Sequence, residues 1–236
     1  MASAIPTRVT VLIILLIPEF AGAATKPHTI TFGKTTTVQW TPGGDEKILT
    51  LKLRPLLVDS RVKEFPLGPA HEITDRLFVI RRAFRLNDIL PQESSAVPRW
   101  QWQRGGWLLV DRVSGRISPL NLPEFDTLYS FASWYRDYAA YCGVSEDGKK
   151  IFAIVAQIGR RKPVLRKPLD VPPIAENAAA DSACPIPTWQ RTPTRVTFEP
   201  IRDAKQTFAI RGHIVDSMTE EGDEENEENA KEETKK

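Results

Sequence analysis

Apolar residues between positions 24 and 219 recur mostly at every second position, in short runs separated by turn residues. This alternation is typical of β-strands that bury one face, because successive side chains of a strand point to opposite sides. No long stretch shows helical spacing, although residues 123–131 could hold one turn. The pattern predicts an all-β body of antiparallel hairpins.

Two hairpins are indicated by their turns. Residues 133–158 fold about Asp147-Gly148, and residues 107–120 fold about Ser114-Gly115. Glycine favours such turns because it adopts positive φ without steric cost. We also expect residues 29–32 and 35–40 to form a hairpin at the start of the body. The other expected strands, in chain order, are 48–53, 56–59, 62–67, 76–85, 99–103, and a final pair at 195–199 and 207–215.

The segment 106–168 resembles consecutive β-propeller blades of the WD40-like or TolB-like kind. The resemblance is carried by WLLVDRVSGRISPL and by SWYRDYAAYCGVSEDGKKIFAIVA, in which Glu146 stands where propeller turns often have proline. A fainter copy lies at 40–67, and the chain as a whole resembles an exported bacterial protein. The resemblance implies stacked four-stranded units. A small β-sandwich or barrel is the competing architecture.

The first 23 residues have the order of a secretory signal peptide. The apolar run Val9–Ile17 is followed by Pro18, and Ala21-Gly22-Ala23 supplies small residues before a cut at Ala24. This nine-residue run is too short for an uninterrupted membrane span, which needs about 20 residues. We therefore expect a secreted or periplasmic protein with no stable membrane insertion after cleavage; an N-terminal anchor is the alternative.

Residues 220–236 contain nine acidic and three basic residues and no aromatic or branched aliphatic residue. Such a segment cannot bury enough apolar surface to fold, so we expect a disordered acidic tail. It could bind calcium or a partner, or simply aid solubility. The leader contains one basic and one acidic residue. Without the leader and the tail, residues 24–219 contain 28 basic and 20 acidic residues, a net charge of +8. We expect these residues to form a single β-rich domain.

Two basic clusters are candidate partner surfaces for an unknown protein or an envelope polyanion. One contains Arg81, Arg82 and Arg85, and the other contains Arg160 and Arg161. Nucleic acid is not an expected partner outside the cytoplasm. The alternative is that these side chains belong to ordinary solvated strands and loops.

The two cysteines of the chain, Cys142 and Cys184, are expected to form a disulfide, as an even pair does in an exported protein. The bond would hold the Pro- and Ala-rich loop 168–193 against the core. In the chain-entropy interpretation, closing a loop of this length stabilises the fold by roughly 3–4 kcal/mol.

No motif indicates a catalytic site, a cofactor site or a metal site. The three histidines, His28, His71 and His213, have no metal-ligand spacing. His28 is expected to be loose near the N-terminus of the mature chain, and His71 to have a turn role. Glu124 and Asp126 are the carboxylates to inspect for glycosidase chemistry, which needs a pair.

Aromatic residues are concentrated between positions 100 and 141. Trp100, Trp102, Trp134 and Tyr135 are the candidate ligand-binding residues, because exposed rings bind sugars, although buried rings would simply fill a core. The most favoured function is a non-enzymatic interaction or envelope-associated module, without cofactor. The alternative is a carbohydrate-binding module or glycoside hydrolase that uses the aromatic cluster 100–141.

Overall fold

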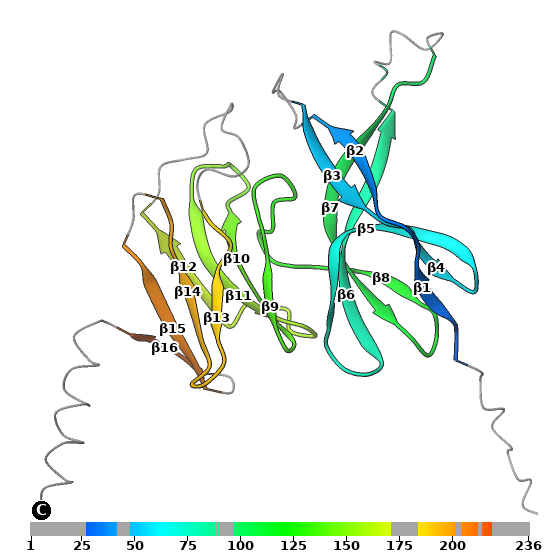
Figure 1. Ribbon diagram of the computed structural model, residues 1–236. Helices are drawn as coiled ribbons and strands as arrows, with labels where there is room; N and C mark the ends of the chain where they lie inside the picture. The colour runs from blue at the N-terminus through cyan, green and yellow to red at the C-terminus, as the bar shows by residue number, and fades with distance from the viewer. Residues whose placement is uncertain are drawn as a thin grey trace, which may run out of the picture.

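A computed structural model describes residues 27–41, 48–87, 89, 97–170, 184–201, 204–211 and 214–218. Within these residues all regular elements are β-strands, and the paired strands are antiparallel. The predicted all-β, antiparallel fold class is therefore confirmed. The strands form three sheets that lie one beside the next (Figure 1).

The first sheet contains eight strands. Six follow the order β1-β4-β5-β6-β7-β8, and β3 attaches β2 to β5. The end of β6 beyond residue 83 and the start of β7, which pairs with it, extend away from the rest of the sheet. Together with β2 and β3 they form an arm (Figure 1). The strands are β1 (Ile30–Phe32), β2 (Thr36–Trp40), β3 (Leu49–Leu53), β4 (Leu56–Val58), β5 (Arg61–Glu72), β6 (Leu77–Asn87), β7 (Trp100–Asp111) and β8 (Ile117–Leu120).

The second and third sheets are simple meanders, in which each strand pairs with its neighbour along the chain. Four-stranded meanders of this order occur in propeller blades. Sheets that pack face to face also occur in sandwiches. The second sheet contains β9 (Ser133–Tyr135), β10 (Tyr138–Val144), β11 (Ile151–Gln157) and β12 (Leu165–Leu169). The third contains β13 (Thr188–Gln190), β14 (Arg195–Phe198), β15 (Gln206–Arg211) and β16 (Ile214–Met218).

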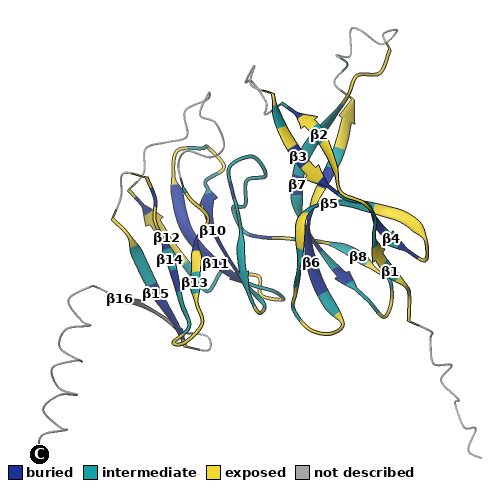
Figure 2. Cartoon of the chain, viewed as in Figure 1, coloured by how far each residue is buried: buried dark blue, intermediate teal, exposed yellow. Residues whose placement is uncertain are grey.

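The second sheet is the central layer, buried on both faces (Figure 2). On β11, Phe152 and Ile154 pack with the first sheet, while Ala153 and Val155 pack with the third. This double burial explains why the run from Ile151 is apolar at successive positions rather than alternating. A third group of buried side chains lies within the first sheet and includes Leu56, Phe78, Ile80, Leu108 and Val110.

The predicted N-terminal hairpin is wrong. β1 pairs with β4, and β2 pairs with β3. Gly33 serves close packing instead of a hairpin turn: it donates its backbone N–H to the carbonyl of Pro55 at 2.8 Å. A Cβ on Gly33 would lie 2.5 Å from the Pro55 side chain.

The hairpins about Ser114-Gly115 and Asp147-Gly148 are confirmed as β7–β8 and β10–β11. Elsewhere the strand boundaries differ from the prediction. The separate runs expected at 99–103 and 107–111 are one strand, β7, and the expected loop 168–193 includes the end of β12 and all of β13.

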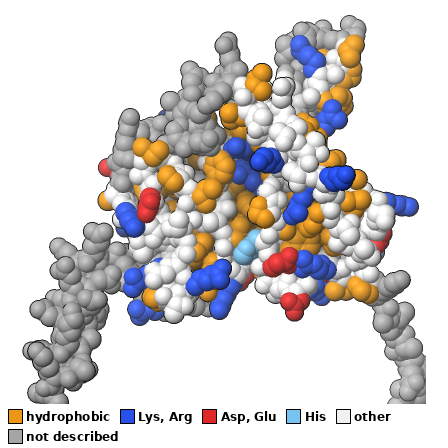
Figure 3. All heavy atoms as spheres, in the orientation of Figure 1, with side chains coloured by type: hydrophobic (Ala, Val, Ile, Leu, Met, Phe, Trp, Pro, Cys, Tyr) orange, Lys and Arg blue, Asp and Glu red, His pale blue; other side chains and the backbone are white. Residues whose placement is uncertain are grey.

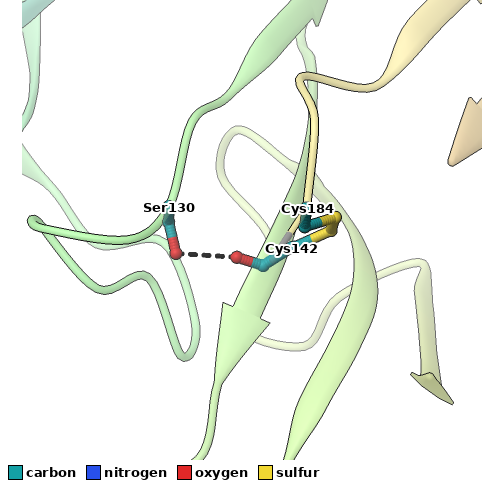
Figure 4. Close-up of a disulfide and its surroundings, with 3 residues drawn as sticks. All are labelled: Ser130, Cys142 and Cys184. Atoms are coloured by element: carbon teal, nitrogen blue, oxygen red, sulfur yellow. Dashed lines mark hydrogen bonds between the residues drawn. A yellow bond between two sulfur atoms is a disulfide. The ribbon is translucent and has the colours of Figure 1, made fainter. Parts of the chain in front are cut away.

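Cys142 of β10 is bonded to Cys184, 42 residues later, as predicted (Figure 4). The bond holds the chain where it enters the third sheet against the central strand β10. The leader 1–23 and the tail 220–236 lie outside the described residues, so their boundaries remain predictions. No helix that could span a membrane occurs in the part of the chain that the structure describes.

Candidate functional site

A cleft of about 550 Å³ lies between the first sheet and the start of the second. Strands β3, β5, β6 and β7 supply one side, and residues 131–134, which lead into β9, supply another. Ile186, two residues after Cys184, contributes a further part of the wall. The volume falls within the range of roughly 300–1,000 Å³ that is usual for small-molecule sites.

The cleft forms at Arg81 of β6, where the strands on both sides of β6 pair with it irregularly. On one side Arg81 pairs with Leu67, and β5 then shifts its register before His71. On the other side Arg81 pairs with Trp107, and β7 carries one extra residue before its next pair with β6. Bulges bend strands and re-aim side chains, and they are frequent beside functional sites. Two bulges beside one residue account for the opening in the sheet at Arg81.

Arg81 is a buried cation, with 7% of its surface exposed. Its Nη2 donates to the carbonyl of Thr127 at 2.8 Å, whereas its Nε has no hydrogen-bond partner and no carboxylate lies within ion-pair distance among the described residues. Burial, together with the neighbouring Arg104, lowers the pKa of Arg81 to about 10, although Asp126 opposes the shift. The guanidinium therefore remains charged at neutral pH.

Arg104 of β7 lies beside Arg81 in the cleft wall. Both guanidinium groups contact the ring of Phe131, with Cζ-to-centroid distances of 5.1 Å for Arg81 and 4.9 Å for Arg104. Arg104 also stacks over Trp40 at 4.0 Å. Cation–π contacts stabilise each group by about 0.5–2 kcal/mol, while the charge of Arg104 repels that of Arg81.

Trp134 is the centre of an aromatic group in the same cleft. Its ring contacts Trp107 edge-on at 5.0 Å and stacks on His71 at 5.7 Å. The Nε2 of His71 donates to the carbonyl of Arg136 at 2.8 Å, which fixes the orientation of the imidazole. The cleft therefore combines a basic group on Phe131 with an apolar group on Trp134.

Cys142 holds two parts of the cleft wall in place (Figure 4). Its carbonyl accepts a hydrogen bond of 2.7 Å from Ser130, the residue before Phe131. Its sulfur is bonded to Cys184, which precedes Ile186 by two residues. The walls that come from loops are thus attached to the most buried layer of the fold.

The cleft is positively charged. The side chains of Lys52, His71, Arg81 and Arg104 line it, and no Asp or Glu is among the described residues of its lining. In Figure 3, Lys and Arg side chains gather in the recess between the two halves of the molecule, next to hydrophobic side chains. This composition favours a ligand that carries negative charge and some apolar surface.

The predicted aromatic residues do not form one cluster. Trp134 lies in the cleft, whereas Tyr135 stacks on Trp189 of the third sheet at 5.5 Å. Trp100 and Trp102 lie on the arm, where Trp100 is 54% exposed. The four candidate residues therefore belong to three separate places.

The rings of Trp100 and Trp102 share one cation. The guanidinium of Arg85, on the neighbouring strand β6, lies 5.7 Å from each ring centroid. Phe65 of β5 contacts Trp102 edge-on at 5.2 Å. The outer part of the arm is thus an aromatic ladder of Phe65, Trp102 and Trp100, in which Arg85 contacts both indole rings and Trp100 forms the exposed end.

The predicted basic surface is also divided. Arg81 is in the cleft, and Arg82, on the same strand, is exposed and forms an ion pair with Glu64 at 3.0 Å. Arg85 lies on the arm, and Arg160 and Arg161 are exposed where the chain leaves β11 on the second sheet.

Glu124 and Asp126, the carboxylates considered for catalysis, are occupied elsewhere. Glu124 accepts two hydrogen bonds of 2.7 Å from Arg166, and Asp126 accepts the backbone N–H groups of Leu128 and Tyr129. Neither is among the residues that line the cleft.

The expectation that His28 is loose is wrong, because its Nδ1 lies 2.6 Å from Asp59. His71 is not a turn residue but part of strand β5 and of the cleft, a position that the sequence pattern did not indicate. His213 lies outside the described residues.

Across the described ranges, no group of three or more His, Cys, Asp or Glu side chains could hold a metal ion. Comparison of the chain with family models, curated proteins and solved structures finds no match. The proposal for its function therefore depends on the geometry of the cleft.

Proposed function

We propose that the chain is an exported, non-enzymatic binding domain that holds an anionic ligand in the cleft, against Arg81 and Arg104. The observation that carries the proposal is the buried Arg81 guanidinium, which has no carboxylate within ion-pair distance among the described residues. Burying a charge without a counter-ion costs several kcal/mol. An anion bound in the cleft would offset that cost and would use the donor at Nε.

Two further observations support this function. The disulfide between Cys142 and Cys184 fits an oxidising compartment, in line with the proposed leader. A binding role suits the lining better than a two-carboxylate hydrolase does, because the described residues that line the cleft include no Asp or Glu. We further propose that the two meander sheets are related to propeller blades, which their strand order supports.

The test is anion-dependent stabilisation of the mature chain. The melting temperature is measured with sodium phosphate or citrate against sodium chloride at equal ionic strength. A ligand that binds the folded state stabilises it by about 2.7 kcal/mol at 100 times its Kd, so a saturable rise is expected. Arg81→Met should abolish the rise without unfolding the chain, because it replaces an unpaired buried charge with an apolar side chain.

Arg160→Met is the matched control, since it removes an exposed arginine outside the cleft. It should respond to phosphate as the unmodified chain does. No saturable rise in the unmodified chain, or an equal rise in Arg81→Met, would refute the proposed function.

Carbohydrate binding is a second candidate, favoured by the exposed ring of Trp100 at the end of the aromatic ladder. Stacking of a sugar ring on Trp100 would leave the cleft free. Trp100→Ala should then reduce retention on immobilised envelope polysaccharide while the response to phosphate stays unchanged. Equal retention of Trp100→Ala and the unmodified chain would exclude this surface.

A further inference from the structure

The cleft has two chemically different parts, and their combination restricts the ligand further than its charge does. Arg81 and Arg104 converge on Phe131, which marks the basic part. Trp107 and Trp134 supply an apolar part. A small inorganic anion would satisfy the first part and leave the second uncovered.

Ile186 shows that the apolar part continues to the protein surface. This side chain lines the cleft and is 55% exposed, although Cys184 holds its segment against β10. An exposed branched side chain beside two indole rings is a surface that gains from being covered by apolar atoms, because burying each Å² contributes about 25 cal/mol.

We infer that the ligand is an anionic amphiphile, with a carboxylate or phosphate head at Arg81 and Arg104 and a single apolar tail along Trp107, Trp134 and Ile186. The inference rests on the proposed function, since it requires an anion in the cleft. Charge complementarity places the head, because the lining residues that the structure describes include basic side chains and no acidic one. The volume of about 550 Å³ accommodates a head together with a tail, beyond what inorganic phosphate fills.

The experiment measures the affinity of the mature chain for two homologous series, alkyl carboxylates and alkyl phosphates from two to eight carbons. Calorimetry is performed below the micelle concentration of each compound. Each methylene that enters the cleft is expected to lower Kd by up to about fourfold. The two series distinguish a fatty-acid-like head from a phospholipid-like head.

Ile186→Ser tests the tail without threatening the fold, because the side chain is largely exposed. It should weaken binding of the eight-carbon compounds severalfold and leave that of inorganic phosphate unchanged. Ile201→Ser is the matched control, since Ile201 is 44% exposed and does not line the cleft. It should change neither affinity.

The outcomes separate this inference from the proposed function. If inorganic phosphate binds and chain length has no effect, the tail site is refuted while the anion site stands. If neither phosphate nor any alkyl anion binds, both are refuted. Octyl glucoside binding as tightly as octyl phosphate would overturn the requirement for an anionic head. A peptide of residues 220–236 that displaces phosphate, with no effect of chain length, would identify the acidic tail as the occupant instead.

Discussion

The hydroxyl of Ser130 donates a hydrogen bond of 2.7 Å to the carbonyl of Cys142, and both residues are buried in the structure. The same hydroxyl accepts the backbone N–H of Asp126 at 3.0 Å. Ser130 therefore closes the loop before β9 on itself and attaches it to β10. Because Phe131 follows directly, this pair of bonds positions the ring on which the two cleft arginines converge.

Ser130→Ala should destabilise the protein by about 1–3 kcal/mol, because it leaves the buried carbonyl of Cys142 without its partner. Urea unfolding measures the change. Ser133→Ala is the control: its hydroxyl is buried without a hydrogen-bond partner, so the substitution should be neutral or slightly stabilising. Equal losses in the two variants would contradict the role given to Ser130.

Cys184→Ala should cost about 4 kcal/mol, because the disulfide closes a 42-residue loop in the unfolded chain. Urea unfolding of this variant and of the unmodified chain under reducing conditions should give the same free energy. Binding of octyl phosphate should also weaken, since the bond anchors the segment that carries Ile186, the proposed contact of the apolar tail. A loss below about 1 kcal/mol would show that the third sheet is held by its apolar contacts alone.

Local chemistry explains which parts of the fold were predictable. The β10–β11 hairpin follows from Asp147-Gly148, where Gly148 has a φ of 70°. The pairing of β1 with β4 was not predictable, because the partners of Ile30 and Phe32 are chosen by packing within the first sheet rather than by a turn. A turn signal says where a chain reverses, but not which strand lies beside it.

The cleft was harder to predict because it depends on two bulges that leave little trace in the sequence. The sequence places Arg81 beside Arg82 and Arg85 in one basic cluster, yet strand alternation puts it on the same face as the buried Val79. Gly105 next to Gly106 within a strand was the available signal, since glycine in a strand often marks a bulge. Of the predicted ligand-binding residues, Trp134 alone lines the cleft.

Asp111→Asn should reduce the loss of stability in acid. Arg76, which donates to Asp111 at 2.9 Å, holds the pKa of this carboxylate well below its usual range. A lowered pKa in the folded state contributes stability above the unfolded value, near pH 4, and this stability is lost as the pH falls toward the folded value. Unfolding free energies between pH 5 and about pH 2 should therefore fall less steeply in the variant.

Arg76→Met should flatten the same pH profile, because it removes the cation that lowers the Asp111 pKa. If Asp111→Asn flattens the profile and Arg76→Met does not, the lowered pKa of Asp111 comes from the hydrogen bonds of Val113 and Ser114 rather than from the ion pair.

Gly105 and Gly106 form a matched pair that tests the bulge in β7 beside Arg81. A Cβ on Gly105 would lie 3.1 Å from the backbone oxygen of Arg82 and 3.3 Å from Phe84, whereas a Cβ on Gly106 would meet nothing within 4 Å. Gly105→Ala should therefore destabilise the protein by about 1–3 kcal/mol through overpacking. Gly106→Ala should be neutral or stabilise by up to about 1 kcal/mol, since it restricts the unfolded chain.

The two variants should also differ in the cleft. A Cβ on Gly105 would push against the backbone of Arg82, which moves together with the rest of β6. This movement would shift the adjacent residue, Arg81. Gly105→Ala should then weaken the stabilisation by phosphate, while Gly106→Ala should preserve it. Equal phosphate responses, with stability lost in Gly105→Ala alone, would mean that the bulge supports the fold without positioning the arginine.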